Sequence, residues 1–207
     1  MDTIATPAGD ARFDVRTAQG TELLTLVLGH GAGGGIEAAD LVALAEVLPG
    51  RGITVVRVEQ PWRVAGRRVA TSPAALDLAW TSVLAELALT GRVVVGGRSA
   101  GARVACRTAR EVGAAGCVAL AFPLHPPGRP ERSRLIELTE AGVPTLVVQG
   151  ERDAFGGPDA FPRERPSSYA LVPVPGADHS FRVTRGHDRD LTLAALARTV
   201  GDWLLTP

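Results

Sequence analysis

The sequence predicts an α/β fold in which helices cover both faces of a mostly parallel central sheet. Short runs of β-branched and aliphatic residues recur along the chain, and most are too continuously apolar to leave one face in water. Longer segments with helical periodicity separate these runs, which is typical of right-handed βαβ crossovers. The chain has 207 residues, 45% of them hydrophobic and 21% charged, so we expect one globular domain spanning residues 1–207.

The expected strands differ in how exposed they are. Segment 11–17 alternates polar and apolar residues, as a half-exposed strand does. The other strands are expected to be buried on both faces, at 23–29, 53–59, 92–97, 117–122, 144–150 and 169–174.

The expected helices lie between the strands, at 36–48, 73–90, 99–112, 131–141 and 188–205. Ser72 followed by Pro73 marks the start of the second helix, as an N-cap with proline at the first helical position. The connections are short, so we expect no sizeable cap domain over the sheet and an open site.

The charge composition excludes several classes of function. The formal net charge is zero, which gives no electrostatic basis for binding nucleic acid or an anionic membrane. All 22 basic residues are arginine, because the sequence contains no lysine. This excludes a Walker A phosphate loop, a pyridoxal phosphate Schiff base and a lysine base or nucleophile.

The sequence also bears on the cellular compartment. Segment 1–20 has acidic residues and no apolar signal-peptide core, and no run approaches the roughly 18 apolar residues that span a bilayer. We therefore expect a cytoplasmic protein. Cys106 and Cys117 lie in apolar segments without C-x-x-C spacing, which predicts buried, reduced thiols; a disulfide or redox pair is the alternative.

Segment 25–40, TLVLGHGAGGGIEAAD, passes from an expected strand through glycines into an expected helix. Gly29, Gly31 and Gly34 have the G-x-G-x-x-G spacing of a dinucleotide-binding loop. Residues 30–34 also fit a loop whose backbone N–H groups stabilise the oxyanion of an acyl-transfer reaction. The loop alone does not decide between these two interpretations.

A second glycine-rich turn carries a candidate nucleophile. In VVVGGRSAGARVA, residues 93–105, an apolar strand leads into G-x-S-x-G and then into a helix. Such a turn holds Ser99 in strained backbone geometry, and Gly97 and Gly101 let strand and helix approach closely. The N-terminus of the helix supplies the Ala100 N–H where an oxyanion forms.

A serine nucleophile needs a base, and the base needs an acid that orients it. Asp153 follows the strand at 144–150, and His179 follows the strand at 169–174. Both therefore lie at the carboxyl ends of strands, where α/β sheets assemble their sites. Glu151 and Asp159 are the alternatives for the acid.

These residues decide how the loop at 30–34 is interpreted. A dinucleotide site is favoured by Glu59, which ends the next strand where a ribose-binding acid is expected. That interpretation leaves Ser99, Asp153 and His179 without a role. In the hydrolase interpretation Ala32 supplies the second oxyanion N–H and His30 orients the loop.

The sequence resembles the α/β-hydrolase superfamily in the segments GHGAGGG, GGRSAG, FPLHPPGRPE, GERDAFG and GADHSF. PLHPPG makes it similar to the small, cap-less, dienelactone-hydrolase-related branch, which also includes a subunit of a eukaryotic histone acetyltransferase complex. The resemblance implies an α/β-hydrolase fold with Ser99 as nucleophile, Asp153 as acid and His179 as base. Dienelactone hydrolases proper use cysteine where this chain has serine, so their substrate is not carried over.

Several residues are candidates for contacting the substrate. Trp62 and Arg63 follow the strand at 53–59, Arg98 lies inside the G-x-S-x-G turn, and His125 follows the strand at 117–122. Arginine binds carboxylates bidentately, which suggests a preference for anionic esters. Solvated arginines and a histidine that packs its own loop are the alternatives.

Together these observations predict a serine hydrolase acting on an ester, thioester or similar small acyl substrate through an acyl-enzyme. The predicted mechanism uses no metal and no cofactor. The alternatives are a non-catalytic interaction protein with the same fold and a dinucleotide-dependent enzyme. Self-association into a homo-oligomer is left open.

Overall fold

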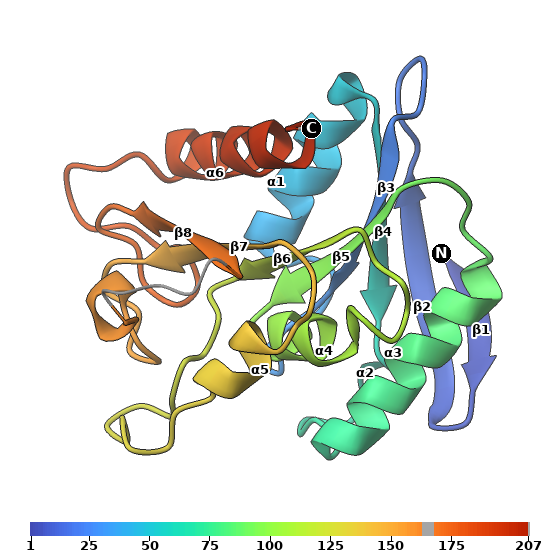
Figure 1. Ribbon diagram of the computed structural model, residues 1–207, viewed down its shortest axis with the longest axis horizontal. Helices are drawn as coiled ribbons and strands as arrows, with labels where there is room; N and C mark the ends of the chain where they lie inside the picture. Colours follow the sequence, from blue (N-terminus) through green and yellow to red (C-terminus); the bar gives the residue numbers. More distant parts are fainter. Residues whose placement is uncertain (163–167, 207) are drawn as a thin grey trace.

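A computed structural model of the chain describes residues 1–162 and 168–206 (Figure 1). These residues form one eight-stranded sheet in the order β1-β2-β4-β3-β5-β6-β7-β8. The strands are β1 (Asp2–Thr6), β2 (Gly9–Arg16), β3 (Leu24–Gly29), β4 (Ile53–Glu59), β5 (Val93–Arg98), β6 (Gly116–Leu120), β7 (Thr145–Gly150) and β8 (Tyr169–Val174). Neighbours from β4 to β8 pair in parallel, whereas β1 and β2 pair antiparallel at one edge. The mostly parallel sheet predicted from the apolar runs is confirmed.

Helices cover both faces of the sheet (Figure 1). Helices α1 (Ala39–Val47) and α6 (Arg189–Leu204) lie together on one face, while α3 (Pro73–Leu87), α4 (Ala100–Thr108) and α5 (Leu135–Thr139) lie on the other. Shorter elements are α2 (Pro61–Val64) and the 3₁₀ turns η1 (Leu48–Arg51) and η2 (Pro158–Ala160). The two coverings explain why β3, β4, β6 and β7 are buried at every residue. Ser72 caps α3 as predicted, because its Oγ accepts a hydrogen bond from the N–H of Ala75.

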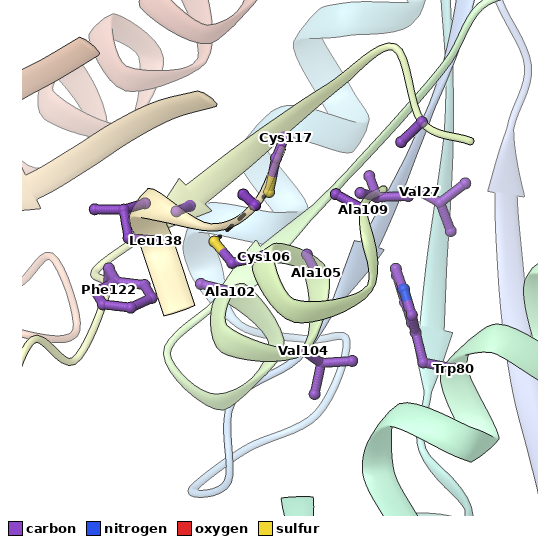
Figure 2. Packing of buried hydrophobic residues seen from close by; sticks show 14 of the residues in the cluster. Val27, Trp80, Ala102, Val104, Ala105, Cys106, Ala109, Cys117, Phe122 and Leu138 are labelled. Atoms are coloured by element: carbon purple, nitrogen blue, oxygen red, sulfur yellow. Dashed lines mark hydrogen bonds between the residues drawn. The ribbon is translucent and has the colours of Figure 1, made fainter. Parts of the chain in front are cut away.

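The core is divided by the sheet into two clusters, one under each layer of helices. Figure 2 shows the cluster under α3 and α4, where the Trp80 side chain and small α4 residues pack against the strands. Cys106 on α4 and Cys117 on β6 are fully buried free thiols whose sulfur atoms lie 3.8 Å apart. The predicted buried, reduced thiols are therefore confirmed.

The structure differs from the sequence prediction mainly at the edges. Strand β1 was not expected, because its sequence DTIAT has one large apolar residue and its residues are exposed or half-buried. The helices expected at 99–112 and 131–141 are shorter, at Ala100–Thr108 and Leu135–Thr139. In the part of the chain that the structure describes, no helix is both long and apolar enough to cross a membrane.

Candidate functional site

Ser99 occupies the sharp turn between β5 and α4. Its backbone angles are φ 52° and ψ −113°. This conformation is strained for a residue with a side chain, and such strain is found where the surrounding structure holds a functional residue in place. The flanking glycines make the turn possible. A Cβ on Gly97 or on Gly101 would collide with the backbone carbonyl of Gly29 on β3, so only glycine allows α4 to pack this closely.

Three of the predicted side chains meet at the carboxyl ends of the strands. Ser99 Oγ lies 2.9 Å from Nε2 of His179, and Nδ1 of His179 lies 2.8 Å from Oδ2 of Asp153. The loops after β5, β7 and β8 supply one residue each. The alternative acids are not in this chain of contacts: Glu151 accepts a hydrogen bond from the N–H of Gly176, and Asp159 is exposed.

The Asp153 carboxylate is buried and accepts hydrogen bonds at both oxygens. The Asp153 side chain has no exposed surface, whereas a fifth of the His179 side chain is exposed. Oδ1 of Asp153 accepts from the N–H of Phe155 at 2.8 Å, and Oδ2 accepts from Nε2 of Gln149 at 2.9 Å. The ring of Phe155 lies against the imidazole of His179, with centroids 4.2 Å apart. These contacts fix the orientation of the imidazole toward Ser99.

The glycine loop after β3 lies beside this serine. A Cβ on Gly31 would lie 3.3 Å from Cβ of Ser99. Ala32, in the same loop, and Ala100, the first residue of α4, line one small, mostly apolar cavity of about 10 Å³. Because Ala100 lies in the first turn of a helix, its N–H has no acceptor within the helix.

His30 fastens the base of the glycine loop. Its Nδ1–H donates to the carbonyl of Gly31 at 2.8 Å, and its Nε2 accepts from the N–H of Gln60 at 3.0 Å. This pair of contacts requires the neutral imidazole. Burial lowers the pKa of His30 below its ordinary value, which favours the same form. The orienting role predicted for His30 agrees with these contacts.

The Arg98 side chain is held by two contacts within the protein. Its Nε donates to Oδ2 of Asp40 at 3.0 Å, and its Nη2 donates to the backbone carbonyl of His179 at 2.6 Å. Arg98 is 9% exposed and Asp40 is 3% exposed, so this is a buried ion pair. Burial raises the pKa of Asp40, and the neighbouring guanidinium opposes that rise. These two contacts give Arg98 a structural role in holding the loop of His179, and a substrate contact for Arg98 stays a prediction.

The other candidate substrate residues are placed as follows. Trp62 on α2 is buried, packs at a tilt against the ring of His30 and lines the small cavity. Arg63 is half-buried and faces Glu37 at 3.6 Å, so an acidic side chain already neighbours it. His125 is half-buried, and its Nδ1 donates to the carbonyl of Pro126, as a histidine that packs its own loop does.

The acid required by a dinucleotide site is engaged elsewhere. Glu59 is 7% exposed and forms an ion pair with Arg12 of β2, at 2.7 Å. Glu59 is therefore not free to bind a ribose beside the glycine loop.

Sequence reasoning missed Gln149 and Asp40. Both are buried polar residues in apolar segments, and that is the only signal the sequence carries for them. Their partners, Asp153 and Arg98, become apparent only once the strands are packed side by side.

The geometry is suited to nucleophilic acyl transfer. The imidazole lies within hydrogen-bond distance of the hydroxyl whose proton it would take, and a buried carboxylate orients the other ring nitrogen. The helix N-terminus and the glycine loop flank the hydroxyl where negative charge would develop.

Comparison of sequences matches most of the chain to one family. The sequence profile described as an alpha/beta hydrolase domain matches residues 22–204. No functionally curated protein has a sequence that matches the chain significantly.

Solved structures resemble the fold over nearly its whole length. A lidless α/β serine hydrolase from Xanthomonas campestris is 22% identical with a TM-score of 0.75, and the match covers 99% of this chain and 94% of that one. An α/β serine hydrolase homologue from Coxiella burnetii is 21% identical with a TM-score of 0.79, covering 98% and 96%. A dienelactone hydrolase from Anabaena variabilis is 20% identical with a TM-score of 0.73, covering 99% and 95%.

Proposed function

Because this chain belongs to the α/β hydrolase domain family, we propose that it is a serine hydrolase that cleaves an ester, thioester or similar small acyl substrate. One observation carries the proposal: the continuous contact from Ser99 Oγ through both nitrogens of His179 to the buried carboxylate of Asp153. A serine that serves only as a turn residue needs no base on one side and no buried acid behind it.

In the proposed mechanism, His179 takes the proton of Ser99 as Oγ attacks the acyl carbonyl carbon. Asp153 holds the Nδ1–H tautomer of the ring and stabilises the imidazolium that forms. The N–H groups of Ala32 and Ala100 donate to the oxyanion. The imidazolium then protonates the leaving group. Water, deprotonated by the same ring, releases the acid and restores the hydroxyl of Ser99.

The cavity beside the oxyanion position favours short acyl groups. It is walled by Trp62, Leu76, Trp80 and Val104 and has a volume of about 10 Å³. A space of this size holds about one water-sized group. The methyl group of an acetyl ester matches this size, whereas a longer chain requires these side chains to move.

Labelling with a fluorophosphonate probe tests the proposal. Intact mass is measured after labelling of the wild type, Ser99→Ala, His179→Ala and the control Ser180→Ala, which changes an exposed neighbouring serine. We expect one adduct in the wild type and in Ser180→Ala, and none in the other two. A folded wild type that takes no adduct would contradict the proposal and favour a non-catalytic interaction protein.

A further inference from the structure

We propose that Gln149 is a positioning residue of this site: its side-chain amide holds the Asp153 carboxylate, and the loop carrying it, at hydrogen-bond distance from His179. The inference rests on the proposed hydrolase function and adds a residue to it. Gln149 does not touch the reacting atoms and acts through Asp153.

The side-chain amide nitrogen of Gln149 lies within hydrogen-bond distance of three acceptors. Gln149 lies on β7, is 0% exposed, and directs Nε2 toward three acceptors. Nε2 lies 2.7 Å from the carbonyl of Gly156, 2.9 Å from Oδ2 of Asp153 and 3.2 Å from the carbonyl of Phe122. One nitrogen thus links the end of β6, the strand β7 and both ends of the 153–156 turn.

The chemistry of the acid explains why a donor is needed there. A carboxylate without exposed surface stays ionised only if donors replace its lost hydration. Among the residues that the structure describes, Oδ1 of Asp153 has the N–H of Phe155, and Oδ2 has only the imidazole of His179 and the amide of Gln149. Without the amide, the histidine alone would compensate Oδ2, and the turn would lose one of its connections to β7 and to the segment after β6.

The unpaired oxygen of the Gln149 amide argues against a role in packing alone. Among the residues that the structure describes, Oε1 of Gln149 is buried without a hydrogen-bond partner. Leucine or methionine would fill the same space without leaving a buried acceptor unpaired. The amide is therefore useful here for its donors. Gly156, which one of them reaches, is closely packed: a Cβ on it would lie 2.9 Å from Leu124.

Other charged groups surround the acid and its imidazole and remain when Gln149 is changed. Arg98, paired with Asp40, binds the backbone carbonyl of the histidine. His125 Nε2 approaches the turn near Gly156. Glu151 and Asp178, beside the two loops, accept hydrogen bonds from backbone N–H groups. A pH dependence that changes only in Gln149 variants is thus assigned to this residue.

The test measures the rate constant for fluorophosphonate labelling of Ser99 as a function of pH, which requires no knowledge of the natural substrate. Gln149→Leu removes the donor, and Gln149→Glu keeps the shape while replacing the donor with an ionisable acceptor. Val148→Ala is the matched control, because this fully buried neighbour on β7 faces the opposite core cluster. Urea unfolding of all variants records their stability.

We expect Gln149→Leu to label about tenfold or more slowly than the wild type, the size of one hydrogen bond to a charged group. Its pH profile should also differ from that of the wild type, because the carboxylate that faces the imidazole has lost a hydrogen-bond donor. Gln149→Glu should lose labelling further as pH rises, since two adjacent carboxylates resist ionising together. Val148→Ala should lose stability with an unchanged profile.

Contrary results have distinct meanings. If Gln149→Leu, or Gln149→Glu where the leucine variant does not fold, labels with the wild-type rate and pH profile, the positioning role is wrong. The same holds if Val148→Ala shifts the profile equally. A folded wild type that is never labelled removes the proposed function itself, and this inference with it.

Discussion

Replacing Arg98 with methionine removes two interactions that the structure concentrates in one side chain. Nε of Arg98 neutralises the buried Asp40 on α1, and Nη2 holds the backbone carbonyl of His179. Methionine keeps most of the side-chain volume, so the change isolates the loss of charge and donors.

The expected loss of stability follows from the burial of Asp40, which is 3% exposed. Breaking a buried ion pair by removing one partner costs about 3–5 kcal/mol, because a buried charge is left uncompensated. Asp40 can reduce this cost by binding a proton. Burial already raises its pKa, and removing Arg98 takes away the largest opposing influence.

The sign of the pH dependence is then fixed. When the pKa of a carboxyl group is higher in the folded than in the unfolded state, the protein loses stability as pH rises through the folded-state pKa. The deficit of Arg98→Met relative to the wild type should therefore be small in acid and grow as pH increases. The double variant Asp40→Leu/Arg98→Met should recover most of the lost stability, since no buried charge is left.

Urea unfolding across this pH range, with fluorophosphonate labelling of the same samples, checks the account. Labelling should fall in Arg98→Met and in the double variant, because both lose the donor to the His179 carbonyl. A deficit below about 1 kcal/mol at neutral pH, or one that does not change with pH, would refute the reasoning.

Three further predictions concern the turn, the loop and the cavity. Ser99→Gly should abolish labelling yet raise the free energy of unfolding by about 1 kcal/mol in urea titrations, because glycine tolerates the positive φ; an unchanged or lower stability would contradict stored strain. The wild type should lose stability as pH falls below 6.5, where the unfolded state protonates His30 and the folded state resists, whereas His30→Gln should show a flatter dependence in the same titration. Leu76→Ala should improve hydrolysis of p-nitrophenyl hexanoate relative to acetate about tenfold, because it widens the cavity; an unchanged ratio would place the acyl chain elsewhere.

The parts of this molecule that could be predicted from sequence are those with a local signature. The turn at Ser99 is predicted by its glycines and by its place between a strand and a helix. Asp153 and His179 are predicted by their positions just after strands. Parallel strands bring such positions to one edge, so the contacts between these residues follow from chain order.

The parts that could not be predicted depend on packing between distant segments. Arg98 has the sequence context of a site arginine, but its partners, Asp40 and the carbonyl of His179, lie 58 and 81 residues away. Gln149 lies in a strand whose other side chains are nearly all apolar, and its role emerges only when β6 and β7 are side by side. Strand β1 is held by pairing with β2 at an exposed edge, where hydrophobic pattern carries little information.

The most direct test of the central claim is to locate the fluorophosphonate adduct by peptide mapping. Arg98 and Arg103 flank the turn, so trypsin releases peptide 99–103, whose only serine is Ser99. The account predicts that this peptide carries the adduct in the wild type and is unmodified in His179→Ala treated in the same way. An adduct on another peptide, or one on 99–103 that forms as fast without His179, would contradict the claim that the imidazole activates Ser99.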